Sequence, residues 1–337
     1  MKISPENITD VLKDNYYGVM SIFYETQSSF LSGIYKKYNG IETANIALCF
    51  LRNLNLEIIR QREKDLNFDI SLENYKNNIN KINKPVEKIS SIVEITGIPK
   101  ETARRKIKKL LSSGILSNSN KNKGYTWNFL SKTKESYSQS LEEIKALSKF
   151  TQKFASLLNL NLEMKTIEQE IRSEFSFYWY HFLSCQLQWL QMWQYKLKDN
   201  DLLLISLQAT IPTLNNSNKN SKNLNIDNLY KIIGKTAQKE NDKEIAVSAT
   251  SVSDITGIPR ATCIRKLNKL VMLGFLLREE KSKRYFINQN SNERTRTILT
   301  NENVGKTITI FSHYLSIILN SLSFRKKNAS KFSSSIK

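Results

Sequence analysis

The sequence predicts a mainly α-helical chain with two small β-hairpins, arranged as two similar units in tandem. Three observations lead to this fold class. Apolar residues recur at helical spacing along much of the chain, glycines and prolines interrupt these patterns at matching places, and one segment of 35 residues occurs twice. The 337 residues are enough for two ordinary units, each able to bury its own core.

The repeated segment is the most informative feature of the sequence. Residues 91–125 and 251–285 align without a gap at an offset of 160, and 16 of the 35 aligned positions are identical. Unrelated segments of this length match at only a few positions. We therefore interpret the chain as a tandem duplication.

A fainter match continues outside this core. Residues 35–36 fall on residues 195–196, and the apolar helical pattern of residues 144–158 falls over that of residues 304–318. This favours duplication of a whole unit, with leading helices, a shared core and a trailing helix, about a pseudo-twofold axis. The alternative is that only the core is duplicated and that unrelated helices flank it.

Each copy of the core predicts two helices across a tight turn. Ser91 to Glu94 and Ser251 to Asp254 have the spacing of a capping box, which starts a helix by satisfying its free amide groups. A glycine follows almost at once and can take the left-handed conformation that ends a helix. The proline two residues later suits the first turn of a second helix.

The second helix carries an apolar stripe, and a hairpin pattern follows it. Short apolar runs flank a polar, basic turn in residues 115–127 and again in residues 275–287, which predicts strand, exposed tip and strand. The apolar positions at helical spacing are Ala103, Ile107, Leu110 and Leu111 in the first copy and Cys263, Leu267, Leu270 and Val271 in the second.

Two helices across a glycine turn, followed by a hairpin, form a winged helix-turn-helix. The string T-G-I-P-x-x-T-x-x-R-K-[IL]-x-K-L-x-x-x-G-[IFL]-L strongly resembles that region in the MarR and IclR groups of bacterial transcriptional regulators. The resemblance implies a DNA-binding unit that is present twice. The leading and trailing helices are more similar to those of MarR proteins, where such helices form the dimer interface.

The predicted boundaries follow from the repeat and from this resemblance. They are residues 1–160 for the first repeat, with its winged helix at about 86–130, residues 161–320 for the second, with its winged helix at about 246–290, and residues 321–337 for a basic tail that we expect to be disordered. Three further stretches rich in Asn, Ser and Lys are expected to be loops, namely residues 74–84, 131–140 and 213–228.

The charge points to an anionic partner. The formal net charge is +20, and such a surface favours molecules that carry phosphate or acidic lipid. Arginine is scarce, yet six of the 13 arginines fall in the two core segments. Residues 97–125 hold eight Lys and Arg against one acid, and residues 257–287 hold eight against two. This excess is what a DNA-binding face requires, because phosphate contacts dominate affinity.

The residue types on the outer face of the second helix fit this partner. That helix enters the major groove, where Arg can donate two hydrogen bonds to guanine and Thr can touch a thymine methyl group, while Lys fits phosphate as a point charge. The hairpin tips would reach the backbone or the neighbouring minor groove. The predicted DNA-binding residues are Lys100, Thr102, Arg104, Arg105, Lys108, Lys109, Lys121, Lys123, Arg260, Thr262, Arg265, Lys269, Lys281, Lys283 and Arg284.

We expect sequence-specific binding to double-stranded DNA, most simply by a transcriptional regulator in which one chain acts as a pseudo-dimer. The oligomeric state would be either a monomer that acts as a pseudo-dimer or a dimer of two such chains. One alternative is a replication initiator of the plasmid or phage type, which also has tandem winged helices. The other is a scaffold that uses its winged helices to bind protein.

Other classes of function have little support in the sequence. Three distant cysteines and two histidines give no zinc spacing and no disulfide framework, which predicts a reducing compartment. Neither a signal core nor an apolar stretch of about 20 residues is evident, so we expect a cytoplasmic protein without a membrane partner. No catalytic grouping or cofactor motif stands out, and we expect no enzyme.

One helix is unusually aromatic. Residues 175–195 contain nine aromatic side chains, several of which share a helical face. They are interpreted as core or as an interface between the two halves. The alternative is a pocket for a small apolar effector near Trp189 and Trp193, since concave aromatic surfaces bind such ligands.

Overall fold

The computed structural model describes residues 3–119, 123–128, 133–220, 245–288 and 301–334, and most of them are helical. The first part of the chain contains α1 (Pro5–Asp14), α2 (Tyr16–Tyr38), α3 (Ile41–Lys64), α4 (Tyr75–Lys81), α5 (Ile89–Thr96), α6 (Lys100–Ser112), β1 (Leu116–Ser119), β2 (Gly124–Trp127) and α7 (Thr133–Leu157). The second part contains α8 (Met164–Ser173), α9 (Phe175–Leu197), α10 (Asn200–Asn220), α13 (Ala249–Thr256), α14 (Arg260–Met272), β3 (Leu276–Arg278), β4 (Tyr285–Ile287) and α16 (Asn301–Ser334). The predicted fold class, mainly α with two small antiparallel sheets, is confirmed.

Each small sheet is a hairpin tied to the segment that precedes its helix pair. Leu116 lies opposite Trp127 in the first hairpin, and Leu276 lies opposite Ile287 in the second. Backbone bridges then join Glu87 to Tyr125 and Val247 to Tyr285. These bridges hold the hairpin against the start of α5 or α13, so that helices and hairpin form one rigid unit.

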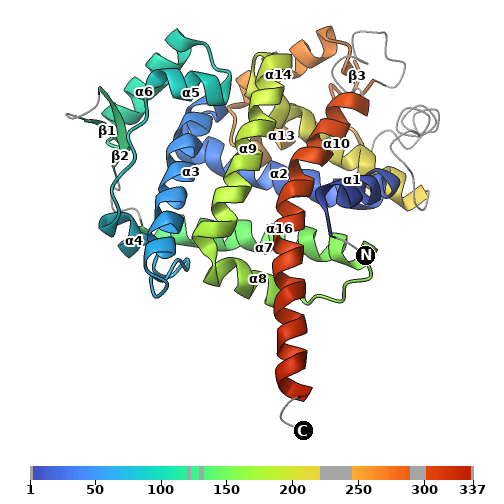
Figure 1. Ribbon diagram of the computed structural model, residues 1–337. Coiled ribbons are helices and arrows are strands. Elements are labelled where there is room, and N and C mark those ends of the chain that lie inside the picture. Colours follow the sequence, from blue (N-terminus) through green and yellow to red (C-terminus); the bar gives the residue numbers. More distant parts are fainter. Residues whose placement is uncertain (1–2, 120–122, 129–132, 221–244, 289–300, 335–337) are drawn as a thin grey trace.

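The long helices of the two parts cross over each other. Helix α9 packs on α3 and α5, and α2 packs on α10 and α13. Helix α1 packs on α16, and α8 packs on α7. Figure 1 shows α9 running through the middle of the molecule between α3 and α16. The pair α5 and α6 therefore packs on a long helix from the second part of the chain, and the pair α13 and α14 packs on one from the first part.

The starts of the helices follow a regular spacing. Helices α8, α9 and α10 follow α1, α2 and α3 at one constant offset, whereas α13 and α14 follow α5 and α6 at an offset that is longer by a single position. When the starts of α2 and α9 are aligned, Lys36 falls on Tyr195. The sequence alone favours an alignment shifted by one position, in which Tyr35 falls on Tyr195. The difference arises between the start of α3 and the start of α5, where the sequence offers no motif to reveal it.

Several stretches expected to be loops are helical. Helix α4 occupies residues 75–81, α7 already begins at Thr133, and α10 continues to Asn220. Buried side chains explain two of these cases, since Ile79 is fully buried on α4 and Leu214 is 2% exposed on α10. In a stretch that is otherwise polar, a single buried apolar residue gives no periodic pattern from which a helix could be predicted. Helix α16 likewise continues to Ser334, through most of the stretch where a disordered tail was expected.

The helix starts also differ from the expected capping boxes. Helix α5 begins at Ile89, so Ser91 lies inside it and does not cap it. Helix α13 is capped by Ser248, whose hydroxyl accepts a hydrogen bond from the Ser251 amide at 3.0 Å while the Ser251 hydroxyl accepts one from the Ser248 amide at 3.1 Å. The expected boxes were wrong because each helix begins one turn earlier than the sequence pattern indicates.

The aromatic helix is part of the core. Trp189 is 1% exposed, its indole donates a hydrogen bond to the Thr307 hydroxyl at 3.2 Å, and its ring lies edge-on to Phe23 and Phe311. These partners belong to α16 and α2, so α9 joins distant parts of the chain. The interpretation of this helix as core agrees with the burial.

One helix meets the length and composition of a membrane span. The stretch from Glu302 to Arg325 in α16 has a mean hydropathy of 1.2, and 56% of its most apolar window is buried inside the protein. The sequence analysis expected no such stretch. Its contacts with α1 and α9 are those of a core helix.

Replacing Trp189 by Ala should lower the free energy of unfolding by about 3–5 kcal/mol, because a large side chain leaves a cavity and its hydrogen bond to Thr307 is lost. Urea denaturation followed by far-ultraviolet circular dichroism measures this change. Met272→Ala is the matched control, since Met272 is 82% exposed on α14 and its loss should cost about 0.5 kcal/mol or less. Equal effects of the two changes would contradict the assignment of Trp189 to the core.

Candidate nucleic-acid interface

The turn between the two short helices is held by the same bonds in both copies. The buried Thr96 hydroxyl donates to the Ile92 carbonyl at 2.7 Å and accepts from the Ile98 amide at 3.3 Å. Thr256 makes the corresponding two bonds at 2.6 and 3.2 Å. The repeated Thr-Gly-Ile string is thus explained as a local turn in which one hydroxyl ends the first helix and orders the entry to the second.

The glycine of each turn has a left-handed backbone and a close neighbour. Gly97 has φ +67° and Gly257 has φ +75°, a region that side chains rarely adopt. A Cβ atom at Gly97 would lie 3.2 Å from Cζ of Tyr195 on α9, and one at Gly257 would lie 2.8 Å from Cε of Lys36 on α2. The local conformation therefore requires glycine at both places, and the Tyr195 and Lys36 side chains lie against these turns.

The predicted apolar stripe of the second helix faces the core. Ala103, Ile107 and Leu110 on α6 and Cys263, Leu267 and Leu270 on α14 are 0 to 2% exposed, while Leu111 and Val271 at the edge of the stripes are half-buried. Because one face is fixed inward, the opposite face of each helix must point to solvent.

A lysine on the inner face anchors each second helix. Lys106 pairs with Glu42 at the start of α3 at 3.2 Å, and Lys266 pairs with Asp201 at the start of α10 at 3.3 Å. Lys266 also contacts Asp199 at 2.6 Å. Acidic side chains at a helix N-terminus are favoured by the helix dipole, so these carboxylates stabilise α3 and α10 as well.

Sequence reasoning counted these two lysines as part of the basic excess and missed their role. A signal was available, because Lys106 and Lys266 lie at helical spacing from Ala103 and Leu110 or from Cys263 and Leu270. A charged residue inside an apolar stripe in both copies indicates a buried partner.

The cations predicted to contact DNA lie on the outer faces. Arg104 forms an exposed pair with Glu101 at 2.9 Å, which contributes little to stability. Thr102 and Thr262 are half-buried beside the exposed residues. The exposed predicted residues of these helices are Lys100, Arg104, Arg105, Lys108 and Lys109 on α6 and Arg260, Arg265 and Lys269 on α14.

The hairpin tips are also basic and exposed. Lys123 and Lys283 occupy equivalent places and both have positive φ, +39° and +55°, where each tip reverses direction. Lys281 and Arg284 are exposed beside Lys283. Lys121, the remaining predicted contact, lies outside the described residues.

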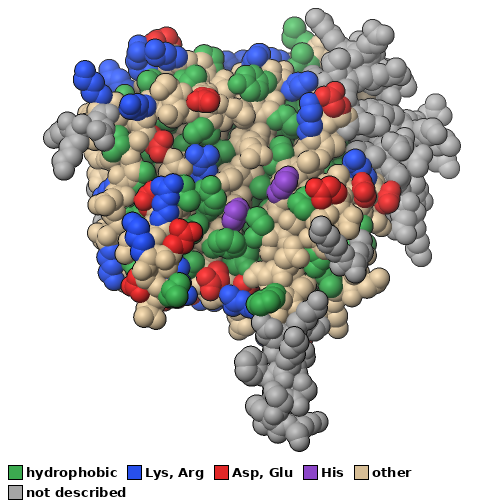
Figure 2. Space-filling view, in the orientation of Figure 1, with side chains coloured by type: hydrophobic (Ala, Val, Ile, Leu, Met, Phe, Trp, Pro, Cys, Tyr) green, Lys and Arg blue, Asp and Glu red, His purple; other side chains and the backbone are tan. Residues whose placement is uncertain are grey.

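The two helix pairs lie at the same end of the molecule. In Figure 1 both α6 and α14 lie along the upper edge, and α7 and α8 lie at the opposite end. Figure 2 shows Lys and Arg side chains gathered at the upper left over α6, with more along the upper edge toward α14. The predicted contacts of α6 and of α14 therefore both lie toward this edge, while Lys121 lies outside the described residues.

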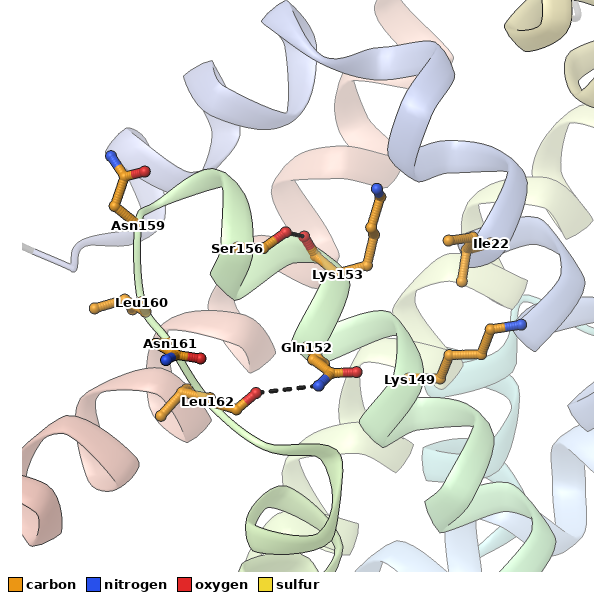
Figure 3. A pocket seen from close by; sticks show the side chains of 9 residues that line it. All are labelled: Ile22, Lys149, Gln152, Lys153, Ser156, Asn159, Leu160, Asn161 and Leu162. Carbon is orange, nitrogen blue, oxygen red and sulfur yellow. Dashed lines mark hydrogen bonds between the residues drawn. The ribbon is translucent and has the colours of Figure 1, made fainter.

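Other hollows and clusters offer less chemistry. A surface hollow of about 550 Å³ lies at the end of α7, where Lys149 and Lys153 stand beside the turn that Gln152 holds through the Leu162 carbonyl at 3.2 Å (Figure 3). Within the described residues no group of His, Cys, Asp and Glu could hold a metal ion.

The alternative of an effector pocket near Trp189 and Trp193 stays a prediction. Trp189 and Trp193 are 1% and 6% exposed in the core. A cavity of about 800 Å³ instead lies at the other end of α9, where Phe175 and Trp179 line it. The sequence showed the aromatic helix but not which end of it would pack completely.

Comparison with known proteins adds no relative to this description. No protein-family model matches the chain, and neither a curated protein nor a solved structure matches it.

Lys266→Ala should destabilise the protein by about 1–3 kcal/mol, because it leaves Asp199 and Asp201 without their cation. Their side chains are about a quarter exposed, and water there limits the cost. Lys106→Ala removes one pair and should cost about 0.5–1 kcal/mol. Chemical denaturation of both variants, with the exposed Lys269→Ala on the same helix as control, tests this order. A Lys266→Ala variant no weaker than Lys269→Ala would refute the anchoring role.

Proposed function

We propose that this chain is a sequence-specific double-stranded DNA-binding protein with two winged helix-turn-helix units, and that it regulates transcription. The observation that supports this most directly is that the basic residues of α6 and α14 fall into two groups, buried and exposed. On each helix one lysine is paired inward with carboxylates, while the remaining predicted Arg and Lys side chains stay exposed. If the basic residues served only to keep the protein hydrated, neither helix would need a lysine that ties its inner face to the body of the protein.

The chemistry of the exposed face suits a duplex. Arg105 and Arg265 occupy the same place on their helices, as do Thr102 and Thr262, near the end that would enter the major groove. Lys108, Lys109 and Lys269 lie further along, where a helix passes the phosphate backbone. Basic hairpin tips beside each helix extend the contact to neighbouring phosphates.

We further propose that the two parts of the chain arose by duplication and form a pseudo-dimer. The spacing of the helices supports this, and so does the reciprocal packing of α9 on α3 and α5 and of α2 on α10 and α13. The two anchors agree as well, since Glu42 and Asp201 are the second residues of α3 and α10, and each pairs with the lysine of its own part. This arrangement would orient both second helices without a second chain.

The two units should read related but unequal half-sites. Glu101 and Arg104 pair with each other on α6, whereas Ala261 and Ile264 stand at those positions on α14. The second helix thus presents an apolar surface where the first presents charge. The half-site read by α14 should be the more degenerate one.

The first test of this proposal is the loss of affinity in two variants. Arg105→Ala and Arg265→Ala should each weaken binding to a selected duplex by about 1–3 kcal/mol and relax base preference on one side of the site. Lys123→Ala should weaken binding to all sequences about equally, because it contacts phosphate. Fluorescence anisotropy with labelled duplexes measures these effects, and affinity should fall steeply as salt rises.

The matched control is Lys149→Ala, which removes an exposed lysine near the end of α7, away from α6 and α14. It should leave the affinity unchanged within about 0.3 kcal/mol, since a distant exposed charge is largely screened. Unchanged affinity in the Arg105→Ala, Arg265→Ala double variant would refute the assigned helices. Binding to protein partners that is insensitive to salt would favour a scaffold instead.

The second test concerns stoichiometry. If one chain is a pseudo-dimer, it should span two half-sites about one helical turn apart, roughly 34–36 Å, on one face of the duplex. Tethering makes the second contact intramolecular, so a second chain need not be recruited. Native mass spectrometry on a footprinted site should show one chain per pair of half-sites. Two chains, each using one winged helix, would contradict the pseudo-dimer.

A further inference from the structure

Helices α9 and α16 pack on each other, and both have a long stretch without charge. Residues 175–195 of α9 and 307–324 of α16 contain no Asp, Glu, Lys or Arg, although 24% of the whole chain is charged. Charged residues border these stretches, and at one end Arg325 on α16 pairs with Glu174 before α9 at 3.2 Å. The outer sides of the two stretches are called the α9–α16 face below.

The α9–α16 face is accessible although it is uncharged. Residues three and four positions apart share one side of a helix, so the residues of each stretch that are not buried lie together. Figure 2 shows both histidine side chains on the side turned to the viewer. Half-buried or exposed residues of the face are Phe177, Tyr180, His181 and Ser184 on α9 and Thr309 and His313 on α16. Aromatic residues without neighbouring charges are typical of the centre of a protein–protein interface.

The matching helix in the first part of the chain is charged at the same places. Helix α7 corresponds to α16 at the offset of the repeated segment, so Lys149 falls on Thr309. In the same alignment Lys153 falls on His313, and both lysines are exposed. Figure 3 shows these two lysines on α7 and Ile22 on α2 around the surface hollow.

Helices α2 and α9 differ in the same way. When their starts are aligned, the exposed Glu25 on α2 falls on Ser184 on α9. The fold therefore accepts exposed charges at all three of these places in the first part of the chain. Packing alone does not explain why the second part has none of them.

The size of the α9–α16 face suits a stable contact. Helix α9 has 23 residues, and α16 is longer. Two such helices side by side cover about 35 Å by about 20 Å, or about 700 Å². A standard protein–protein interface buries about 800 Å² on each partner. A partner that covered this face would therefore bury about as much surface as a stable dimer needs.

The charge of the chain favours a second copy as that partner. A formal net charge of +20 makes two copies repel each other over most of their surface. The α9–α16 face is free of these charges, and each copy has one, so two copies can pair about a twofold axis through the same residues. A lipid surface fits less well, because it favours large apolar side chains that are fully exposed, and most of those on this face are polar or half-buried.

We propose that the chain forms a homodimer in solution in which the α9–α16 face of one copy packs on that of the other. The aromatic and aliphatic side chains supply the apolar contact at the centre. The charged residues at the ends of the two stretches lie at the rim, where water keeps them solvated.

This dimer goes beyond the proposed function and does not depend on it. In Figure 1, α9 and α16 extend down the front of the molecule, whereas α6 and α14 lie along its upper edge. A second copy on the α9–α16 face therefore need not cover the predicted DNA contacts, and the ratio of one chain per pair of half-sites stays the same. Because dimerisation is measured without DNA, it can fail or succeed separately from DNA binding.

Sedimentation velocity of the full chain at micromolar concentration tests the proposal and should give the mass of two chains. The Thr309→Lys, His313→Lys double variant introduces the lysines of α7 and should weaken dimerisation at least ten-fold, because the contact would have to bury the new charges. Ser184→Glu introduces the residue of α2 and should weaken it in the same direction. These two variants place charges on α16 and on α9 separately.

The matched control is the Ser112→Lys, Met272→Lys double variant, which adds two lysines at exposed positions outside the face and should dimerise as the unchanged protein does. Circular dichroism establishes that each variant is folded, and if one charged variant does not fold, the other decides. A monomer at every concentration, or undiminished dimerisation in a folded charged variant, would overturn the proposal. So would a monomeric chain that sediments with phosphatidylcholine vesicles, which would assign the face to a lipid surface.

Discussion

The close approach of a crossing helix to a glycine turn is the constraint on which the rest of the arrangement depends. Gly97 and Gly257 adopt left-handed backbone conformations, and a side chain from a helix of the other part of the chain lies directly against each of them. The positive φ requires glycine at both turns, and at each of them the first short helix packs on a long helix of the other part of the chain, α5 on α9 and α13 on α2. These contacts connect each helix pair to the helical body.

The anchoring lysines complete this restraint from the opposite side. Lys106 and Lys266 connect the inner faces of α6 and α14 to the starts of α3 and α10. The buried apolar stripe fixes which face of each helix points to solvent, and the lysine adds a polar contact on the inner face. On each helix one lysine forms an ion pair on the inner face, and the other basic side chains stay exposed. The exposed positive charge is therefore confined to the outer face of α6 and of α14. That surface is the physical basis of the proposed interaction with DNA.

The two parts of the chain are similar in plan and different in detail. Glu101 and Arg104 correspond to Ala261 and Ile264 on the outer surface, and Ile34 corresponds to Trp193 in the interior. A pair of identical subunits could not carry such differences, because each substitution would appear twice. A single chain can therefore carry different side chains at matching places, while its two parts keep a similar order of helices.

The sequence by itself determined the two pairs of short helices, their hairpins and the outward direction of residues such as Arg105 and Arg265. These features are local, because glycine conformation, helical periodicity and hairpin turns depend on neighbours within a few residues. Only the tertiary structure showed that Lys106 and Lys266 are anchors, and that the starts of the leading helices follow a spacing one position shorter than that of the repeated segment. Each of these depends on contacts between residues far apart in the chain, and the packing of side chains across crossing helices is not written in the spacing along any one of them.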